Sequence, residues 1–191
     1  MISILIRHKQ GREELLDRCL ESVFNQTYKN IEVIVSYEGF QVYAYDMKIS
    51  YLKVLHDQHY NLHCNYLKAE VKKGWFFYLD DDDALADTDV LEKLTDQIIN
   101  NYPWKGVYIC QFLRNGRPKP TEIFFKQRGI IKGYIGGGCA VVHSSFKDAA
   151  DWKGVQAGDY YWLKDLEKAG VPMKFIPLVL QKTFNNGLHG K

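Results

Sequence analysis

The first 35 residues place an amphipathic helix pattern between two short apolar runs. The runs at 2–6 and 31–35 consist mainly of isoleucine, leucine and valine, and runs of this length and type favour buried β-strands. Between them, residues 13–26 repeat apolar side chains at helical spacing on one face. A strand, a helix and a second strand in this order form a right-handed crossover with the two strands parallel. This unit therefore predicts an α/β fold.

Strand and helix patterns continue to alternate along the chain, and some of them end at a glycine or a proline. The further strands are predicted at 50–55, 75–79, 106–113, 122–125, 140–143 and 173–176, the last directly before Pro177. The further helices are predicted at 61–73, 88–101 and 159–168, with Gly74 and Gly170 as the C-terminal stops of the first and last. A chain of 191 residues suits one domain. We expect a Rossmann-like, mixed and mostly parallel sheet flanked by helices.

Composition excludes several classes of protein. Apolar residues make up 46% and charged residues 25% of the chain, which is typical of a globular protein, and the net charge of +2 demands neither a nucleic-acid nor a membrane partner. The four cysteines form no Cys-x-x-Cys pair, so zinc and redox sites are not supported, and we expect Cys19 and Cys110 in the core. The apolar start is too short for a signal peptide, and no run reaches the ~20 residues of a transmembrane helix. A cytoplasmic protein is expected.

Four consecutive aspartates, Asp80 to Asp83, follow the predicted strand at 75–79. Carboxylates crowded at the tip of a buried strand repel one another, and a hard divalent cation such as Mg²⁺, Mn²⁺ or Ca²⁺ relieves the repulsion. Because side chains alternate along an extended chain, Asp80 and Asp82 are expected on one face and Asp81 and Asp83 on the other. The alternative is helix capping, since acidic residues are favoured at the start of the helix predicted at 88–101. Capping accounts for Asp83 but not for Asp80 and Asp81.

Over nearly its whole length the chain resembles the family 2 glycosyltransferases of the GT-A fold. The resemblance is closest in the first β-α-β unit, at residues 3–6, 12–16, 19–23 and 25–35. Leu79 with the four aspartates resembles the family's Leu-Asp-x-Asp-Asp motif, and residues 136–142 resemble its glycine-rich acceptor-side strand. Gly158-Asp159 stands where the family carries Glu-Asp. The resemblance implies a nucleotide-sugar-binding half at about 1–101 and an acceptor-binding half at about 102–191.

The resemblance also implies a reaction and roles for particular residues. It predicts metal-dependent, inverting transfer of a sugar from a nucleotide diphosphate sugar to an acceptor hydroxyl, with Mn²⁺ or Mg²⁺ as cofactor. Asp159 is the predicted catalytic base, and Asp80, Asp82 and His189 are the predicted metal ligands. The donor would contact Ile6, Arg7, Lys9, Glu38, Asn65, Asp80 and Asp81. The acceptor stays open between a polysaccharide, a lipid-linked sugar, a protein side chain and a modified nucleic-acid base.

The chain departs from the family pattern around the donor site, and other interpretations stay open. Arg7-His8-Lys9-Gln10 replaces the usual Pro-Thr-Tyr-Asn, Glu38 lies in place of the usual aspartate, and Gly158 replaces the usual glutamate. A catalytically degenerate nucleotide-sugar or carbohydrate-binding module is one alternative. A metal-dependent nucleotidyltransferase is another, although its first loop should hold more glycine than residues 7–12 do.

Individual residues also have plainer interpretations. Asp159 can be an N-cap, and His189 a solvated residue of the tail. Arg7 and Lys9 either pair with phosphate or are solvated charges. Residues 136–138 are either a close approach to a ligand or a flexible glycine turn. Trp152 and Tyr160 either stack on an acceptor sugar or fill the core.

Overall fold

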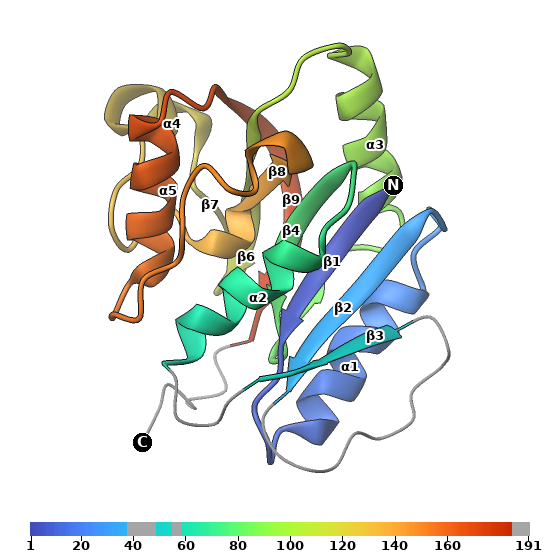
Figure 1. The fold of residues 1–191 in the computed structure, drawn as a ribbon. Coiled ribbons are helices and arrows are strands. Elements are labelled where there is room, and N and C mark those ends of the chain that lie inside the picture. Colours follow the sequence, from blue (N-terminus) through green and yellow to red (C-terminus); the bar gives the residue numbers. More distant parts are fainter. Residues whose placement is uncertain (38–48, 55–58, 185–191) are drawn as a thin grey trace.

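The fold is a twisted mixed sheet with helices on both faces (Figure 1). The structure, a computed structural model, describes residues 1–37, 49–54 and 59–184. The strands are β1 (Ile2–Arg7), β2 (Ile31–Tyr37), β3 (Ile49–Lys53), β4 (Trp75–Asp80), β5 (Asp83–Leu85), β6 (Val107–Arg114), β7 (Arg117–Lys119), β8 (Ala140–His143) and β9 (Met173–Thr183). The α-helices are α1 (Glu13–Phe24), α2 (His63–Glu70), α3 (Val90–Asn100), α4 (Glu122–Arg128) and α5 (Gly158–Lys168). Short 3₁₀ turns are η1 (Tyr60–Leu62), η2 (Gly137–Cys139) and η3 (Ser144–Phe146).

The strand order places the first β-α-β unit beside the strand that carries the aspartates. The described strands lie in the order β3-β2-β1-β4-β8-β6-β9-β5, and β7 pairs with β6. Strands β3, β2, β1 and β4 are parallel, as the crossover rule predicts. Strand β8 runs antiparallel to both of its neighbours, β4 and β6, and β9 is parallel to β6 but antiparallel to β5. The predicted α/β class with a mixed sheet is confirmed.

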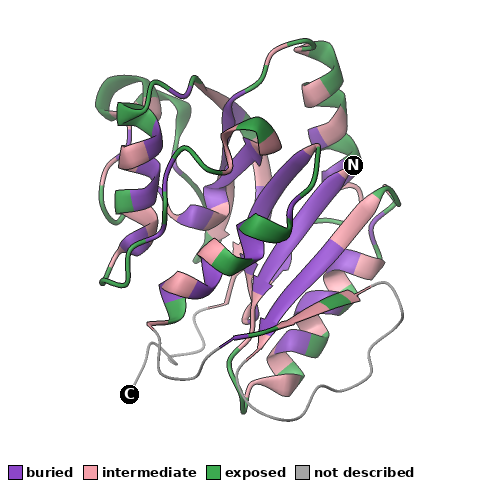
Figure 2. Ribbon diagram, viewed as in Figure 1, coloured by how far each residue is buried: buried purple, intermediate pink, exposed green. Residues whose placement is uncertain are grey.

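Two hydrophobic cores lie on opposite faces of this sheet. Helices α1 and α3 pack with Ile4 and Ile6 on one face, and α2 and α5 pack with Leu5 on the other. Figure 2 shows the central strands buried along their length. Alternate residues of a strand point to opposite faces, so a strand covered on both sides must be apolar throughout. The same alternation puts Arg7 and Asp80, paired in register, on the face of α2.

The predicted helix at 61–73 is wrong in its extent. The chain forms the 3₁₀ turn η1 and then α2, which ends at Glu70 because Val71 adopts an extended conformation and is fully buried in the core. Gly74 is therefore not a helix stop. Its φ is +83°, and a Cβ there would lie 2.4 Å from the Met1 carbonyl oxygen, so the close approach to the start of β1 requires glycine.

Two predictions in the second half are also corrected. Residues 122–125, predicted as a strand, begin α4, because the Thr121 hydroxyl accepts a hydrogen bond from the Phe124 N–H and caps the helix. The strand predicted at 173–176 continues to Thr183 as β9. Pro177 is accommodated because the pairing with β6 shifts register between Ile109 and Gln111, so the ladder is already interrupted there.

The described residues contain no helix that combines the length and apolar character needed to cross a membrane. All four cysteines are free and buried, which confirms the core positions predicted for Cys19 and Cys110.

Candidate active site

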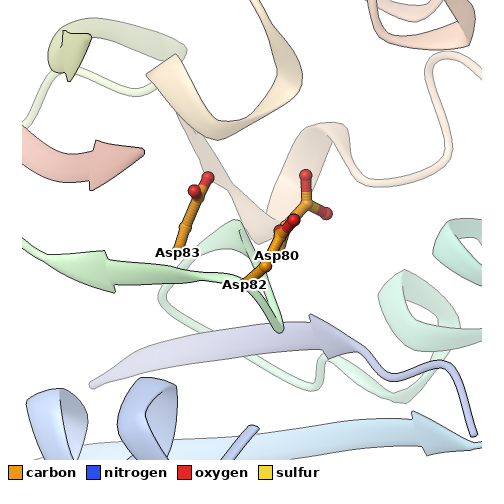
Figure 3. Close-up of side chains that lie close together, drawn as sticks. All are labelled: Asp80, Asp82 and Asp83. Atoms are coloured by element: carbon orange, nitrogen blue, oxygen red, sulfur yellow. The ribbon is translucent and has the colours of Figure 1, made fainter. Parts of the chain in front are cut away.

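Three aspartates gather where β4 ends and β5 begins. Asp80 is the last residue of β4, Asp83 is the first of β5, and the turn between them contains Asp82. One carboxylate oxygen from each lies within 4.8 Å of the other two, and Figure 3 shows the three side chains directed to the same side of the chain. Carboxylate oxygens in this arrangement are the donor set of a hard divalent cation.

The electrostatics of the cluster fit such a cation. Burial, with added contributions from the Asp80 and Asp82 carboxylates, raises the pKa of Asp83 to about 8. Burial also raises the pKa of Asp82, with added contributions from Asp80 and Asp81. Partly buried carboxylates this close together repel one another when they are ionised. A bound Mg²⁺ or Mn²⁺ would neutralise that repulsion, so the residues present suit the predicted cofactor.

Asp83 was expected on the opposite face from Asp80, and this expectation is wrong. Strand alternation holds only while the chain stays extended, and here a turn at residues 81 and 82 separates β4 from β5. After the turn, Asp83 returns to the face of Asp80 and joins the predicted pair as a third candidate ligand.

Asp81 lies on the other face and anchors the loop that follows β1. Its side chain is 3% exposed. It accepts hydrogen bonds from the Lys9 main-chain N–H at 3.0 Å and from Arg12 at 3.2 Å, and it lies 3.1 Å from the His8 ring. These partners compensate the cost of burying the Asp81 carboxylate. Sequence reasoning placed Asp81 and Lys9 at the donor, and the structure shows that they fix each other's position.

Arg7 lies next to the acidic cluster at the carboxyl end of β1. Its guanidinium donates from Nε and Nη2 to Oδ1 of Asp80 and from Nη1 to Oδ1 of Asn61 at 2.8 Å. Its Cζ is 5.0 Å from the ring centre of Tyr60 and 5.7 Å from that of Trp152. Burial alone lowers the pKa of Arg7, but Asp80 and other neighbours more than offset this, so the guanidinium stays charged.

Asn61 is a site residue that sequence reasoning missed. Its side chain is buried, accepts from Arg7, and donates from Nδ2 to the Val155 carbonyl oxygen at 2.8 Å. The helix predicted at 61–73 treated this residue as a helix start. The spacing of residues along the chain carries no signal for a contact between positions 61 and 155.

The other predicted donor residues in the described part of the chain have structural partners. Ile6 is fully buried in the core on the α1 face. The Asn65 side chain makes two hydrogen bonds with the main chain of Trp152. Its Nδ2 donates to the carbonyl oxygen at 2.9 Å, and its Oδ1 accepts from the N–H at 2.8 Å. Trp152 itself is 3% exposed and stacks on Trp162, so it fills the core, whereas Tyr160 is half-buried. Glu38 and His189 lie outside the described residues.

Asp159 lies in the first turn of α5, beside the glycine segment. The N-cap position belongs to Ala157, so Asp159 is not the cap, although its Oδ1 accepts from the Tyr160 N–H at 2.8 Å. A Cβ on Gly136 would lie 3.3 Å from its Oδ2. Burial raises the pKa of the Cys64 thiol to about 12, against a lowering by Arg7 and with smaller contributions from Asp80 and Asp159.

The glycine segment packs against side chains instead of forming a loose turn. A Cβ on Gly137 would lie 2.5 Å from the Trp152 ring, and one on Gly138 would lie 1.8 Å from the Gln181 amide nitrogen. Both distances are shorter than the Cβ contacts seen in proteins, so a side chain at either position would displace the Trp152 ring or the Gln181 amide.

Comparison with solved structures reveals the same fold in larger proteins. The chain aligns over 95% of its length with TarS 1–349 from S. aureus, with a TM-score of 0.77 and 13% identity, and over 98% with the complex of that fragment with UDP-GlcNAc, with a TM-score of 0.74 and 13% identity. It also aligns over 98% with the mannosyltransferase PcManGT from Pyrobaculum calidifontis, solved with GDP-Man and Mn²⁺, with a TM-score of 0.65 and 14% identity.

These similarities confirm the predicted GT-A fold class. The chain spans 36% of the longer TarS structure, 60% of TarS 1–349 and 58% of PcManGT. No protein-family model and no curated protein sequence matches it. The resemblance to family 2 stays a prediction.

Proposed function

We propose that this chain is a metal-dependent glycosyltransferase that moves a sugar from a nucleotide diphosphate sugar to an acceptor hydroxyl with inversion. The observation that carries the proposal is the convergence of Asp80, Asp82 and Asp83 at the carboxyl end of β4. Ligands of open α/β sheets bind at this edge. Two proteins with the same fold were solved with a nucleotide sugar, and one of these also held Mn²⁺.

Asp80, Asp82 and Asp83 would hold the Mn²⁺ or Mg²⁺ ion, whose chemistry when bound is to neutralise charge on the departing diphosphate. His189, outside the described residues, is the further predicted ligand. Arg7 adds a fixed positive charge beside Asp80 and reduces the net charge of the cluster. The donor's nucleotide would lie against the loop at 7–12, whose position Asp81 fixes, with Glu38 and Asn65 as the other predicted contacts.

Asp159 is the proposed catalytic base. It would accept the proton of the acceptor hydroxyl while that oxygen attacks the anomeric carbon, and the nucleoside diphosphate would leave from the opposite face of the sugar. A single displacement of this kind inverts the configuration. The position of Asp159 in the first turn of α5, next to Gly136, supports this role because the glycine leaves one side of the carboxylate uncovered by a side chain.

A thermal-shift screen of UDP and GDP with and without Mn²⁺ tests the proposal. A ligand that binds only the folded state raises Tm by mass action. We expect one diphosphate to raise Tm only with Mn²⁺, and Asp82→Asn to abolish the shift. Asp87→Asn is the matched control, because it removes the same charge from an exposed position outside the cluster.

The outcomes separate the candidate functions. Mn²⁺-dependent binding followed by release of nucleoside diphosphate from the sugar donor, lost in Asp159→Asn, supports the transferase. Binding without turnover of any nucleotide sugar, in wild type and in Asp159→Asn alike, supports the binding module. The absence of any shift with either nucleotide contradicts the donor site.

A further inference from the structure

Asn61 lies between the metal-binding side of the candidate site and the segment that leads into α5. On one side its Oδ1 accepts from Arg7, whose other nitrogens bond Asp80. On the other side its Nδ2 donates to the Val155 carbonyl oxygen. Asn61, which is 3% exposed, thus connects Arg7 and Asp80 with Val155, although these residues are distant in the sequence.

The segment at 153–158 folds closely around this asparagine. A Cβ on Gly158 would lie 2.4 Å from Nδ2 of Asn61 and 2.8 Å from the Lys153 carbonyl oxygen, so the first residue of α5 must be glycine while the Asn61 amide occupies this space. A Cβ on Gly154 would lie 3.2 Å from His59, which shows that η1 and this segment are in close contact.

The entry into α5 is also strained. Ala157, its N-cap residue, adopts a left-handed conformation with φ of 58° and ψ of 37°. A residue with a Cβ occupies this region at a cost, and such a conformation persists only where the surroundings hold it. The bond from Asn61 to Val155 lies two residues before the strained position, and Asp159 lies two residues after it.

We propose that Asn61 is a positioning residue that couples Asp80, through Arg7, to the start of α5 and so to Asp159. This inference rests on the proposed function for the role of Asp159. The coupling path itself consists of the hydrogen bonds Asp80–Arg7, Arg7–Asn61 and Asn61–Val155 together with the packing of Asn61 against Gly158. The Asn61 amide and the Lys153 carbonyl oxygen together fill the volume that a side chain at position 158 would need.

Hydrogen exchange of the amides at 155–162, measured by mass spectrometry on the full chain without metal or nucleotide, tests the coupling. Asp80→Asn weakens the contact with Arg7, and we expect it to speed exchange in this segment about threefold or more. Asp82→Asn is the matched control. It makes the same chemical change in the same cluster, and within the described residues its side chain does not contact Arg7.

A double-mutant cycle then identifies the path. Asn61→Asp keeps an acceptor for Arg7 but removes the N–H that donates to the Val155 carbonyl oxygen. Adding Asp80→Asn in this background should therefore change the exchange rate at 155–162 by less than about 1.5-fold. In the Asn65→Ala background, which loosens Trp152 and leaves Asn61 intact, Asp80→Asn should keep its full effect. Gly158→Ala, which crowds both the Asn61 amide and the Lys153 carbonyl oxygen, is a second way to break the path, with the same loss of coupling expected.

An equal effect of Asp80→Asn in the wild-type, Asn61→Asp and Gly158→Ala backgrounds would overturn the proposal, and so would the absence of any effect in wild type. These readings need no substrate, so they stand apart from a failure of the proposed function. With a donor that turns over, Asn61→Asp should lower kcat about 10-fold and change the donor KM less than about twofold, because a displaced base slows the chemical step. An unchanged kcat would contradict the positioning role.

Discussion

The carboxylates of Asp83 and Asp80 lie within 4.8 Å of each other although the two residues belong to different strands. The turn between β4 and β5 brings them together, and β5 is held in place by pairing with the end of β9, where Asp83 is opposite Thr183. As a proposed third ligand from a separate strand, Asp83 would fix the geometry of the site more firmly than Asp80 and Asp82 alone would.

We expect Asp83→Asn to weaken Mn²⁺ binding by about 10-fold or more, because it removes one of the three proposed anionic ligands. The measurement is the decrease in the free Mn²⁺ signal in electron paramagnetic resonance as protein is added. Asp87→Asn, outside the cluster, should leave the affinity unchanged. Equal affinities in wild type and Asp83→Asn would show that Asp83 is not a ligand.

The raised pKa of Asp83 predicts opposite effects of pH on the metal-free and metal-bound protein. Burial and the neighbouring carboxylates raise its pKa to about 8 from an ordinary value of 3.8. Between these values the folded state keeps a proton that the unfolded chain has released. Asp83 therefore contributes a decrease in the free energy of unfolding of the metal-free protein as pH rises from about 4 to about 8.

Cation binding requires the ionised form of Asp83, so the increase in Tm that Mn²⁺ causes should grow over the same pH range. Thermal melts at several pH values between 5 and 8, with and without Mn²⁺, measure both trends. Asp83→Asn should flatten the metal-free profile relative to wild type. A wild-type profile with the same slope as that of the variant would contradict the assignment to Asp83.

The acidic cluster and the first β-α-β unit could be predicted from sequence because both are local. A short apolar run that ends in aspartates identifies a strand and its carboxyl tip, and the crossover rule then places β1 beside β2. The position of Asp83 beside Asp80 and Asp82 could not be predicted, because the alternation argument fails once the strand ends. The hydrogen bonds of Asn61 depend on the contact between residues 59–62 and 153–158 in the folded chain. The periodicity of a sequence does not predict a contact between segments this far apart.

The misassigned element at 122–125 has a different cause. Four residues are too few to separate a strand from the start of a helix by periodicity, and the cap that decides the matter is a hydrogen bond from the Phe124 N–H to the Thr121 side chain. A threonine followed one position later by Glu122 is only a weak signal of a helix start.

Lys68 ties α2 to the segment at 147–151 from a buried position. Its Nζ donates to the carbonyl oxygens of Lys147 at 2.9 Å and Ala150 at 2.6 Å and to the carboxylate of Asp151 at 2.6 Å. We expect Lys68→Met to lower the free energy of unfolding by about 2–4 kcal/mol, because two carbonyl groups lose their partner in a buried place.

The control for Lys68 is its carboxylate partner. The Asp151 side chain is 80% exposed, and water replaces the lost bond, so Asp151→Asn should cost less than about 1 kcal/mol. Urea denaturation of both variants measures the difference. Equal losses would show that the ion pair, and not the main-chain bonds, accounts for the contribution of Lys68.

The strain at Ala157 predicts a substitution that stabilises the fold. Glycine adopts a φ of 58° without the steric cost that a Cβ brings, so we expect Ala157→Gly to raise the free energy of unfolding by about 0.5–1 kcal/mol after the larger chain entropy of unfolded glycine is subtracted. Gly170, which follows the other end of α5 with φ of +75° and open space around it, gives the matched test of opposite sign. There, Gly170→Ala should lower stability by about 1 kcal/mol through backbone strain alone. Thermal or urea denaturation measures both. If Ala157→Gly lowers stability, the Cβ of Ala157 contributes packing that outweighs its strained backbone.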